Sequence, residues 1–237
     1  MYLERYPDVA PGKCVIIANG YDEEDFAQLG VIPAARRTSG RPVRLVHAGL
    51  IYTDDRDPRF FFRALSRLKA AGMISAHNLQ VDLRASGSED YYSGLLQELN
   101  ISDLVHLLPA LPHQGALEDL AGADGLLLFQ AASCNHQIPA KVYEYFRFGK
   151  PVLALTSASG DTAALLKEVG GATIVELDDE NAIFQSVPRF IRSVEQGTHP
   201  LPDSRKMRKY TRRSETAELA RQLDKLLPSL VAGNGLR

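Results

Sequence analysis

Residues 137–155 read QIPAKVYEYFRFGKPVLAL, and this stretch predicts a helix, an abrupt stop and a buried strand. Pro139 suits the first turn of a helix because its ring fixes a helical φ angle. The apolar positions that then share one helix face are Val142, Tyr145 and Phe146. Gly149 is the residue type that ends a helix in the left-handed conformation, and the proline two positions later blocks continuation. The apolar run at 152–155 is typical of a strand covered on both faces.

Lys141 and Glu144 lie one turn apart at the opening of this helix. Helix N-termini attract anions, and a carboxylate can accept hydrogen bonds from two hydroxyl groups. The pair therefore suits a ligand that carries both phosphate and hydroxyl groups. The alternative is an ordinary Lys and Glu on a solvated helix face.

Short apolar runs alternate with helical patterns along the whole chain. Strands are predicted at 14–18, 43–48, 78–83, 103–108, 123–129, 152–155 and 172–175. Helices are predicted from Asp57-Pro58 to about Ala71, at 89–99, 112–121 and 139–148, from about 161 to Lys167, and at 180–194 and 204–227. A loop is predicted at 30–42 and a frayed end at 231–237. This order predicts an α/β fold, a Rossmann-like parallel sheet with helices on both faces. We expect residues 1–237 to form one domain, with its core at about 14–200 and its C-terminal helix at about 204–227.

Several unusual positions directly follow predicted strands. They are Gly49, Pro109, residues 130–141 and residues 157–162. Because parallel strands end at one edge of a sheet, these positions should meet at a single rim, where such sheets bind ligands. Ser159, Gly160 and Thr162 precede or open a helix and offer backbone N–H groups to an anion. Capping of that helix by Ser159 or Asp161 would explain the same composition.

Composition excludes some partners. The formal net charge is −2 and the isoelectric point is near 6.3, so the basic excess typical of nucleic-acid binders is absent. One basic cluster, at residues 205–213, could touch an anionic membrane surface or be solvated, and solvation is favoured. There are only two cysteines, Cys14 and Cys134, which indicates a reducing compartment and thiols buried as core residues. No apolar run approaches the ~18 residues of a membrane span and no signal-peptide pattern opens the chain, so we expect a cytoplasmic protein.

Two motifs in the central stretch carry a resemblance to a known family. They are Ile138-Pro139-x-Lys141-x-Tyr143-Glu144-Tyr145 and Gly149-Lys150-Pro151-Val152-Leu153-Ala154. Together they resemble the C-terminal, donor-binding domain of family 4 glycosyltransferases of the two-domain GT-B type. The segments 14–26, 49–63 and 123–129 are similar to further parts of the same domain. The resemblance implies a nucleotide-diphosphate sugar as the bound partner.

The resemblance also implies roles for individual residues. Glu144 would bind the ribose hydroxyls, and the backbone beyond Gly49 would face the diphosphate. Arg56 and Lys141 would neutralise the leaving group, although Leu50 stands where many members have an arginine. The loop at Pro109 would hold the base. His136 occupies the position of the first Glu of a spaced pair near the donor sugar, which places catalysis in question while leaving a hydrogen-bonding side chain.

Family members transfer a glycosyl group without a bound catalytic metal, and this chain offers no clustered His, Cys and carboxylate ligands. The resemblance therefore implies no cofactor, and a role in surface polysaccharide or glycoconjugate synthesis. It implies an N-terminal acceptor domain that this sequence lacks, so we expect the chain by itself to transfer little. The full-length parent could contact the inner face of a membrane peripherally.

Two alternative functions can be compared with this one. A non-catalytic nucleotide-binding or regulatory module on the same fold is favoured by His136. A dinucleotide-dependent oxidoreductase is disfavoured, because no Gly-x-Gly-x-x-Gly follows any predicted strand with an acidic partner downstream.

Overall fold

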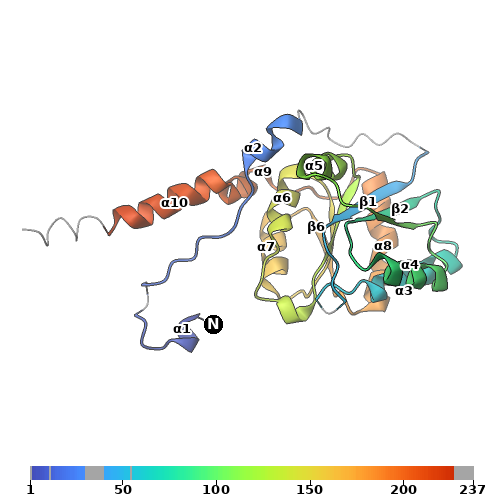
Figure 1. The fold of residues 1–237 in the computed structure, drawn as a ribbon, viewed down its shortest axis with the longest axis horizontal. Helices are drawn as coiled ribbons and strands as arrows, with labels where there is room; N and C mark the ends of the chain where they lie inside the picture. The colour runs from blue at the N-terminus through green and yellow to red at the C-terminus, as the bar shows by residue number, and fades with distance from the viewer. Residues whose placement is uncertain (1, 11, 30–39, 54, 227–237) are drawn as a thin grey trace, which may run out of the picture.

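The computed structural model describes residues 2–10, 12–29, 40–53 and 55–226, and these build one parallel sheet covered by helices. Most of the predicted loop at 30–42 and all of the predicted frayed end at 231–237 lie outside the described residues. The six strands follow the order β3-β2-β1-β4-β5-β6. They are β1 Val43–Ala48, β2 Leu79–Arg84, β3 Val105–Leu108, β4 Gly125–Phe129, β5 Val152–Leu155 and β6 Ala172–Val175. The predicted α/β, Rossmann-like sheet is confirmed (Figure 1).

Helices lie on both faces of this sheet. One face is covered by α3 Arg59–Ala70, α4 Glu89–Glu98 and α8 Glu180–Glu195. The other is covered by α5 His113–Ala121, α6 Ala140–Phe148 and α7 Asp161–Val169. Smaller or peripheral elements are α1 Tyr2–Arg5, α2 Glu23–Phe26, α9 Ser204–Met207, α10 Arg212–Asp224 and the 3-10 turns η1 Ala27–Leu29, η2 Ala132–Cys134 and η3 Arg208–Tyr210. Figure 1 shows α7 and α8 on opposite sides of the strands.

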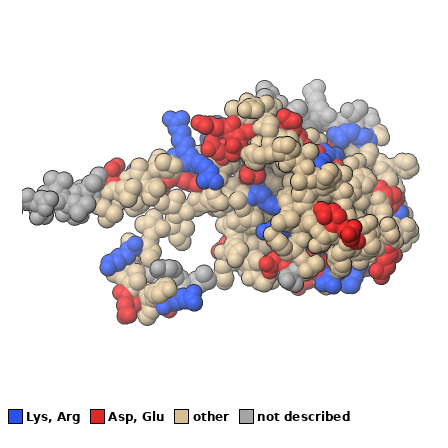
Figure 2. Space-filling view, in the orientation of Figure 1, with Lys and Arg blue, Asp and Glu red and all other residues tan. Residues whose placement is uncertain are grey.

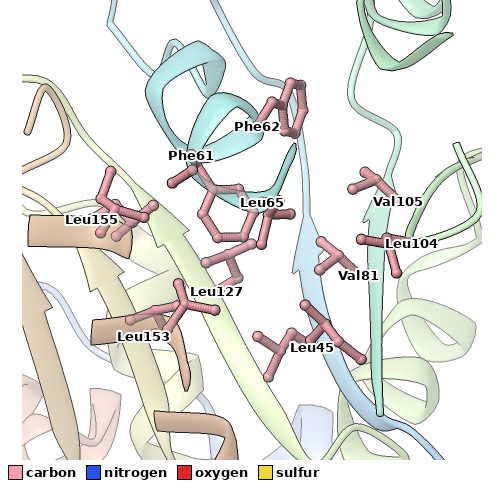
Figure 3. Packing of buried hydrophobic residues seen from close by; sticks show 14 of the residues in the cluster. Leu45, Phe61, Phe62, Leu65, Val81, Leu104, Val105, Leu127, Leu153 and Leu155 are labelled. Atoms are coloured by element: carbon pink, nitrogen blue, oxygen red, sulfur yellow. The ribbon is translucent and has the colours of Figure 1, made fainter. Parts of the chain in front are cut away.

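The core under α3 follows from the apolar spacing of that helix. Phe61 and Leu65 lie one turn apart, are fully buried, and pack on Leu45 and Leu127 of the central strands (Figure 3). The helix predicted to start at Asp57-Pro58 has Pro58 as its N-cap residue. It begins at Arg59, and the Asp57 carboxylate accepts from the Arg59 amide.

The stretch at 137–155 folds as predicted. Pro139 immediately precedes the first residue of α6, and Gly149 ends the helix with φ 63°, which favours a residue without a side chain. Strand β5 follows and is buried along its whole length. This segment therefore fixes Lys141 at the start of α6, next to the carboxyl ends of the strands.

The predicted strand at 14–18 is wrong. Within the described residues this segment is extended but pairs with no strand, and Ile16 is 93% exposed. Its apolar, β-branched composition is that of a strand, but a strand also requires a neighbour to complete its hydrogen bonds. The two cysteines are not core residues either, since Cys14 is exposed and Cys134 is only half-buried.

The predicted helix at 204–227 is interrupted. Tyr21 and Thr211 form a parallel bridge, and the Thr211 side chain accepts from the Ser214 amide, so a new helix starts there. None of the residues of α10 is buried, and this helix extends away from the body (Figure 1). The last predicted residue of the helix, at position 227, lies outside the described residues.

Candidate functional site

The site lies where the strand order reverses. Strand β1 leads outward through β2 to β3, whereas its other neighbour β4 leads to β5 and β6. Strands β1 and β2 pair at six positions, but β1 and β4 pair only at Leu45↔Gly125 and Val46↔Leu126. The two central strands therefore separate toward their carboxyl ends. Such a separation at a topological switch point is the usual ligand crevice of an open α/β sheet.

Side chains satisfy the carbonyl groups that this separation removes from the sheet. Leu127 O accepts from His47 Nδ1 at 2.9 Å and from the Tyr145 hydroxyl at 3.2 Å. Ala48 O accepts from Lys141 Nζ at 2.7 Å. Because buried carbonyl groups need partners, the diverging strands themselves create positions for a histidine, a tyrosine and a lysine.

Lys141 and Gly49 meet at the end of β1. Gly49 has φ 112°, and a Cβ placed there would come within 3.1 Å of Lys141 Nζ. Glycine is thus required twice, once for the backbone angle and once for the space that the ammonium group occupies. Gly49 and Lys141, which were predicted separately for this rim, thus lie side by side.

Lys141 and Arg56 are two neighbouring cations at this end of the sheet. Burial, with a further contribution from Arg56, lowers the pKa of Lys141 to about 7, while Glu144 acts in the opposite direction. The Arg56 guanidinium donates to Leu50 O at 3.1 Å and lies over the Tyr52 ring at 5.2 Å. Neither cation forms an ion pair with a described carboxylate. Such a site favours an anionic ligand, which would supply the missing negative charge.

Glu144 is half-buried one turn after Lys141. Burial raises the pKa of its carboxyl group, and the nearby Asp25 raises it further. The positive charges of His113, Lys141 and Arg212 lower it. His113 opens α5, directly after the loop that follows β3. Glu144 therefore lies between the cations at β1 and the loop of Pro109, which is where a group carrying hydroxyls would bridge the two.

The loop after β4 is held by Gln130. Its side-chain nitrogen donates to Cys134 O at 2.9 Å and to Gln137 O at 2.6 Å, and its oxygen accepts from the Thr156 hydroxyl at 3.2 Å. Thr162 adds a bond from its hydroxyl to Gln137 O at 3.1 Å. A cavity of about 70 Å³ lies against this loop, lined by Asp55, Arg56, Gln130, Cys134, Gln137, Ile138 and Pro139. It admits an anionic group or a few waters and no more.

The corner that opens α7 is joined to the same loop. The Asp161 amide donates to Asn135 O at 2.8 Å, and the Gly160 amide donates to Ser157 O at 3.1 Å. A Cβ at Gly160 would lie 2.8 Å from the Asn135 side-chain oxygen. Neither Ser159 nor Asp161 caps α7, whose N-cap residue is Gly160. Two of the amide groups at this corner thus already have protein partners.

Pro109 lies farther along the same rim. It is exposed, and its carbonyl accepts from Arg84 Nη1 at 2.9 Å. Arg84 also binds Asp119, which in turn binds Arg44. The loop after β3 is therefore anchored to the sheet by a charged network. His136 is exposed in the loop after β4, and no described residue holds its ring in a hydrogen bond.

Sequence reasoning missed His47, and it named Gln130 only as the start of the loop at 130–141. His47 interrupts an otherwise apolar pattern on the buried face of β1, and that irregularity was its only local signal. Gln130 is 2% exposed and directly follows the fully buried β4. A polar residue at the end of an apolar strand indicates a loop that needs internal hydrogen bonds.

Over the described part of the chain, no three His, Cys, Asp or Glu side chains come together as a group that could hold a metal ion. No helix among those residues is long and apolar enough to cross a membrane. Figure 2 shows acidic and basic side chains interspersed on the visible face. In the basic cluster near the C-terminus, Lys206 and Lys209 both bind Glu168, through its carbonyl and its carboxylate respectively.

Comparison with known proteins shows the fold. No family model matches the sequence, and no curated protein does. A glycosyltransferase from Rickettsia africae has a TM-score of 0.66 at 12% identity over 95% of this chain and 60% of that one. The lipopolysaccharide outer core galactosyltransferase WaaB, in its apo form, has a TM-score of 0.63 at 12% identity over 94% of this chain and 59% of that one. The pneumococcal O-GlcNAc transferase GtfA, in complex with UDP and GlcNAc, has a TM-score of 0.59 at 12% identity over 95% of this chain and 43% of that one. The chain thus spans three fifths or less of the length of these glycosyltransferases.

Proposed function

We propose that this chain is the donor-binding domain of a GT-B glycosyltransferase of the family 4 type, and that it binds a nucleotide-diphosphate sugar for metal-independent glycosyl transfer. The observation that carries the proposal is the pair of unmatched cations, Lys141 and Arg56, at the strand-order reversal. A diphosphate supplies the negative charge that this pair lacks. The fold shared with solved glycosyltransferases supports the same ligand class.

The remaining residues fit this ligand along the rim. Lys141 and Arg56 would hold the diphosphate above Gly49, and would stabilise the charge that develops on it as the glycosyl bond breaks. Glu144 would accept hydrogen bonds from the ribose hydroxyls, and the loop at Pro109, anchored by Arg84, would hold the base.

The corner at α7 would complete the donor site. Ser159 is exposed there, and its hydroxyl shares a hydrogen bond of 3.2 Å with that of Ser157. Gly160 allows the corner to approach the loop after β4 closely. Thr162 would contribute through Gln137 O, since its side chain is buried and already donates to that carbonyl. His136 would face the donor sugar from the same loop.

A second domain would supply the acceptor and the other wall of the cleft. The small cavity at the rim cannot enclose a nucleotide, for which pockets of roughly 300 Å³ or more are usual. The glycosyltransferases that share the fold are longer than this chain, which leaves room for such a domain in a full-length parent. The same proposal includes two properties of that parent: contact with a membrane surface, and a role in polysaccharide or glycoconjugate synthesis.

Calorimetric titration with UDP- and GDP-sugars tests the proposal, with Glu144→Ala as the matched variant. We expect one nucleotide sugar to bind and Glu144→Ala to weaken it by about tenfold or more, the value of a lost hydrogen bond to a charged group. Inorganic pyrophosphate, which has no ribose, should bind both proteins equally. Absence of binding to every nucleotide sugar would refute the proposal.

His136 favours one alternative, a nucleotide-binding module without catalysis. It stands where the resembled family has a carboxylate, and it is exposed. Transfer or hydrolysis of a nucleotide sugar by a full-length parent would exclude that alternative. Nucleotide binding without turnover, unchanged in His136→Ala, would favour it.

A further inference from the structure

His47 is the fully buried partner of Lys141. It is 0% exposed, on β1, and its ring packs against Phe129 with the centroids 5.1 Å apart. Its Nε2 lies 3.2 Å from Lys141 Nζ, although 94 residues separate the two in sequence. The proposed function assigns this histidine no role.

The hydrogen bonds of His47 determine which nitrogen carries the proton. Its Nδ1 lies 2.9 Å from Leu127 O, and a carbonyl oxygen can only accept, so Nδ1 donates. Burial lowers the pKa of His47 well below its ordinary value. Lys141 and Arg56 act in the same direction, and hydrogen bonds with the backbone of Leu127 and Gly49 oppose them without reversing the shift, so the ring is neutral. The lone pair of Nε2 is therefore free to accept from the Lys141 ammonium.

We propose that His47 is the positioning residue of the anion site, a neutral acceptor that holds the Lys141 ammonium over Gly49 without cancelling its charge. The inference rests on the proposed function, in that the anion is the diphosphate of the donor. With two of its hydrogens directed to His47 Nε2 and Ala48 O, the ammonium keeps a third for the ligand.

A neutral acceptor matters because of the charges around it. The groups that face Lys141 are Arg56 from the loop after β1, Glu144 from α6 and His47 itself. A carboxylate at the position of His47 would form a short ion pair with the ammonium and remove the positive charge from the site. An imidazole fixes the same geometry and leaves that charge for a ligand.

Three substitutions at this position separate geometry from charge. The side-chain oxygen of His47→Gln can occupy the place of Nε2 and accept from Lys141. His47→Glu has the same shape and adds a negative charge. His47→Asn reaches only the place of Nδ1, so it can keep the bond to Leu127 O but not the one to Lys141. Each variant is first checked by thermal unfolding and circular dichroism.

Binding of inorganic pyrophosphate and of UDP is then measured by calorimetry. We expect His47→Gln to remain within about threefold of the unmodified protein, and His47→Asn and His47→Glu to lose about tenfold or more. NMR titration of ¹³C-labelled lysine, assigned with Lys141→Met, gives a second readout without any ligand. His47→Glu should raise the pKa of Lys141 by about 1 to 3 relative to His47→Gln.

The outcomes separate this inference from the function on which it rests. If the unmodified protein binds neither probe, the proposed function fails, and the lysine titration still decides whether His47 sets the state of Lys141. If it binds and all three variants bind equally well, the inference is overturned. Equal losses in His47→Gln and His47→Asn would also overturn it, because they would show that the ring is needed only for packing.

Discussion

Lys141, which is half-buried, and Lys150, which is buried, lie near opposite ends of α6, and their surroundings differ. Lys150, just beyond the helix, is 4% exposed and donates to Ala123 O at 2.6 Å, whereas Lys141 donates to Ala48 O at 2.7 Å. Burial lowers the pKa of both. At Lys150 the larger charged influence is Asp124, which opposes the shift, and Arg41 adds to it more weakly; at Lys141 the larger one is Arg56, which adds to it, and Glu144 opposes it more weakly. We call the edge of the sheet at Lys150 and Asp124 the matched rim, and the edge at Lys141 and Arg56 the unmatched rim, after the larger charged influence on each lysine.

The matched rim is a structural feature. The Asp124 carboxylate is fully buried and accepts two hydrogen bonds from Arg41, at 2.6 and 2.9 Å, and one from the Arg44 amide. These bonds join the segment before β4 to the start of β1. At Lys150 a carboxylate is the stronger charged influence and no ligand is needed, whereas at Lys141 a second cation is stronger, which indicates a place where an anionic ligand would complete the structure.

The largest expected effect is on stability, at the matched rim. Asp124→Ala removes an acceptor from Arg41 and from the Arg44 amide, and should lower the free energy of unfolding by about 3 kcal/mol. In a chain of this size that corresponds to a fall in Tm of roughly 6–12 °C. Urea denaturation measures the loss. Affinity for a UDP-sugar, measured well below Tm, should not change, and a large drop would contradict the separation of the two rims.

The next effect is on binding, at the unmatched rim. Lys141→Met should weaken binding of a UDP-sugar by about 10- to 100-fold, because one charged hydrogen-bond donor to the diphosphate is lost. Lys150→Met is the matched control and should leave the affinity unchanged. Calorimetry on both variants checks this, and equal losses in the two would show that any buried lysine near α6 supports binding only through the fold.

Lys141 should also lower the free energy of unfolding near neutral pH. Its pKa is about 7 in the folded protein against about 10.4 when unfolded, so the folded state binds the proton less strongly. Above the pKa of the unfolded state the lysine is neutral in both states and costs no stability. As the pH falls toward about 7, the unfolded state takes up a proton that the folded state binds less strongly, so the free energy of unfolding decreases. Lys141→Met should therefore raise Tm at pH 6 more than at pH 9, as thermal unfolding at the two pH values would show.

How much of the fold can be predicted from the sequence depends on how far apart in the chain the determining residues lie. The helix, stop and strand at 137–155 follow from residues within a few positions of one another. The strand at 14–18 was mispredicted because its composition is that of a strand, while pairing depends on a neighbour distant in sequence. The break at Thr211 likewise depends on the bridge to Tyr21.

The candidate site divides in the same way. Gly49, Lys141 and Glu144 could be named from motifs, and the parallel sheet accounts for their common rim. His47 could not be connected with Lys141, because their contact arises from the separation of β1 and β4. Local patterns thus indicate which residues reach the rim, and only tertiary structure shows how each is held there.

A smaller effect concerns the pH dependence of binding. The positive charge of Lys141 is complete well below pH 7 and is lost as the pH rises through that value. Affinity for a UDP-sugar should be constant below about pH 6.5 and then decline by up to about tenfold per pH unit. Calorimetry between pH 6 and 8.5 tests this, and the decline should be absent in Lys141→Met. A flat profile in the unmodified protein would contradict the unmatched state of this lysine.

The smallest effect is expected at Thr162. Thr162→Val keeps the shape of the side chain and removes the hydrogen bond to Gln137 O, which retains its bond from Gln130. We expect a loss of stability of about 1 kcal/mol and a change in affinity within about threefold. Urea denaturation and calorimetry measure the two. A loss beyond tenfold would show that the hydroxyl contacts the ligand itself.

The lowered pKa of Lys141 also has a chemical consequence. Near neutral pH a substantial share of this side chain is a free amine with an available lone pair, whereas an ordinary lysine is in that form only to about 0.1%. The free amine is the nucleophilic form. A small acylating or aldehyde reagent that reaches the rim should modify Lys141 before the solvent-exposed lysines. That selectivity offers a covalent label for the proposed diphosphate position.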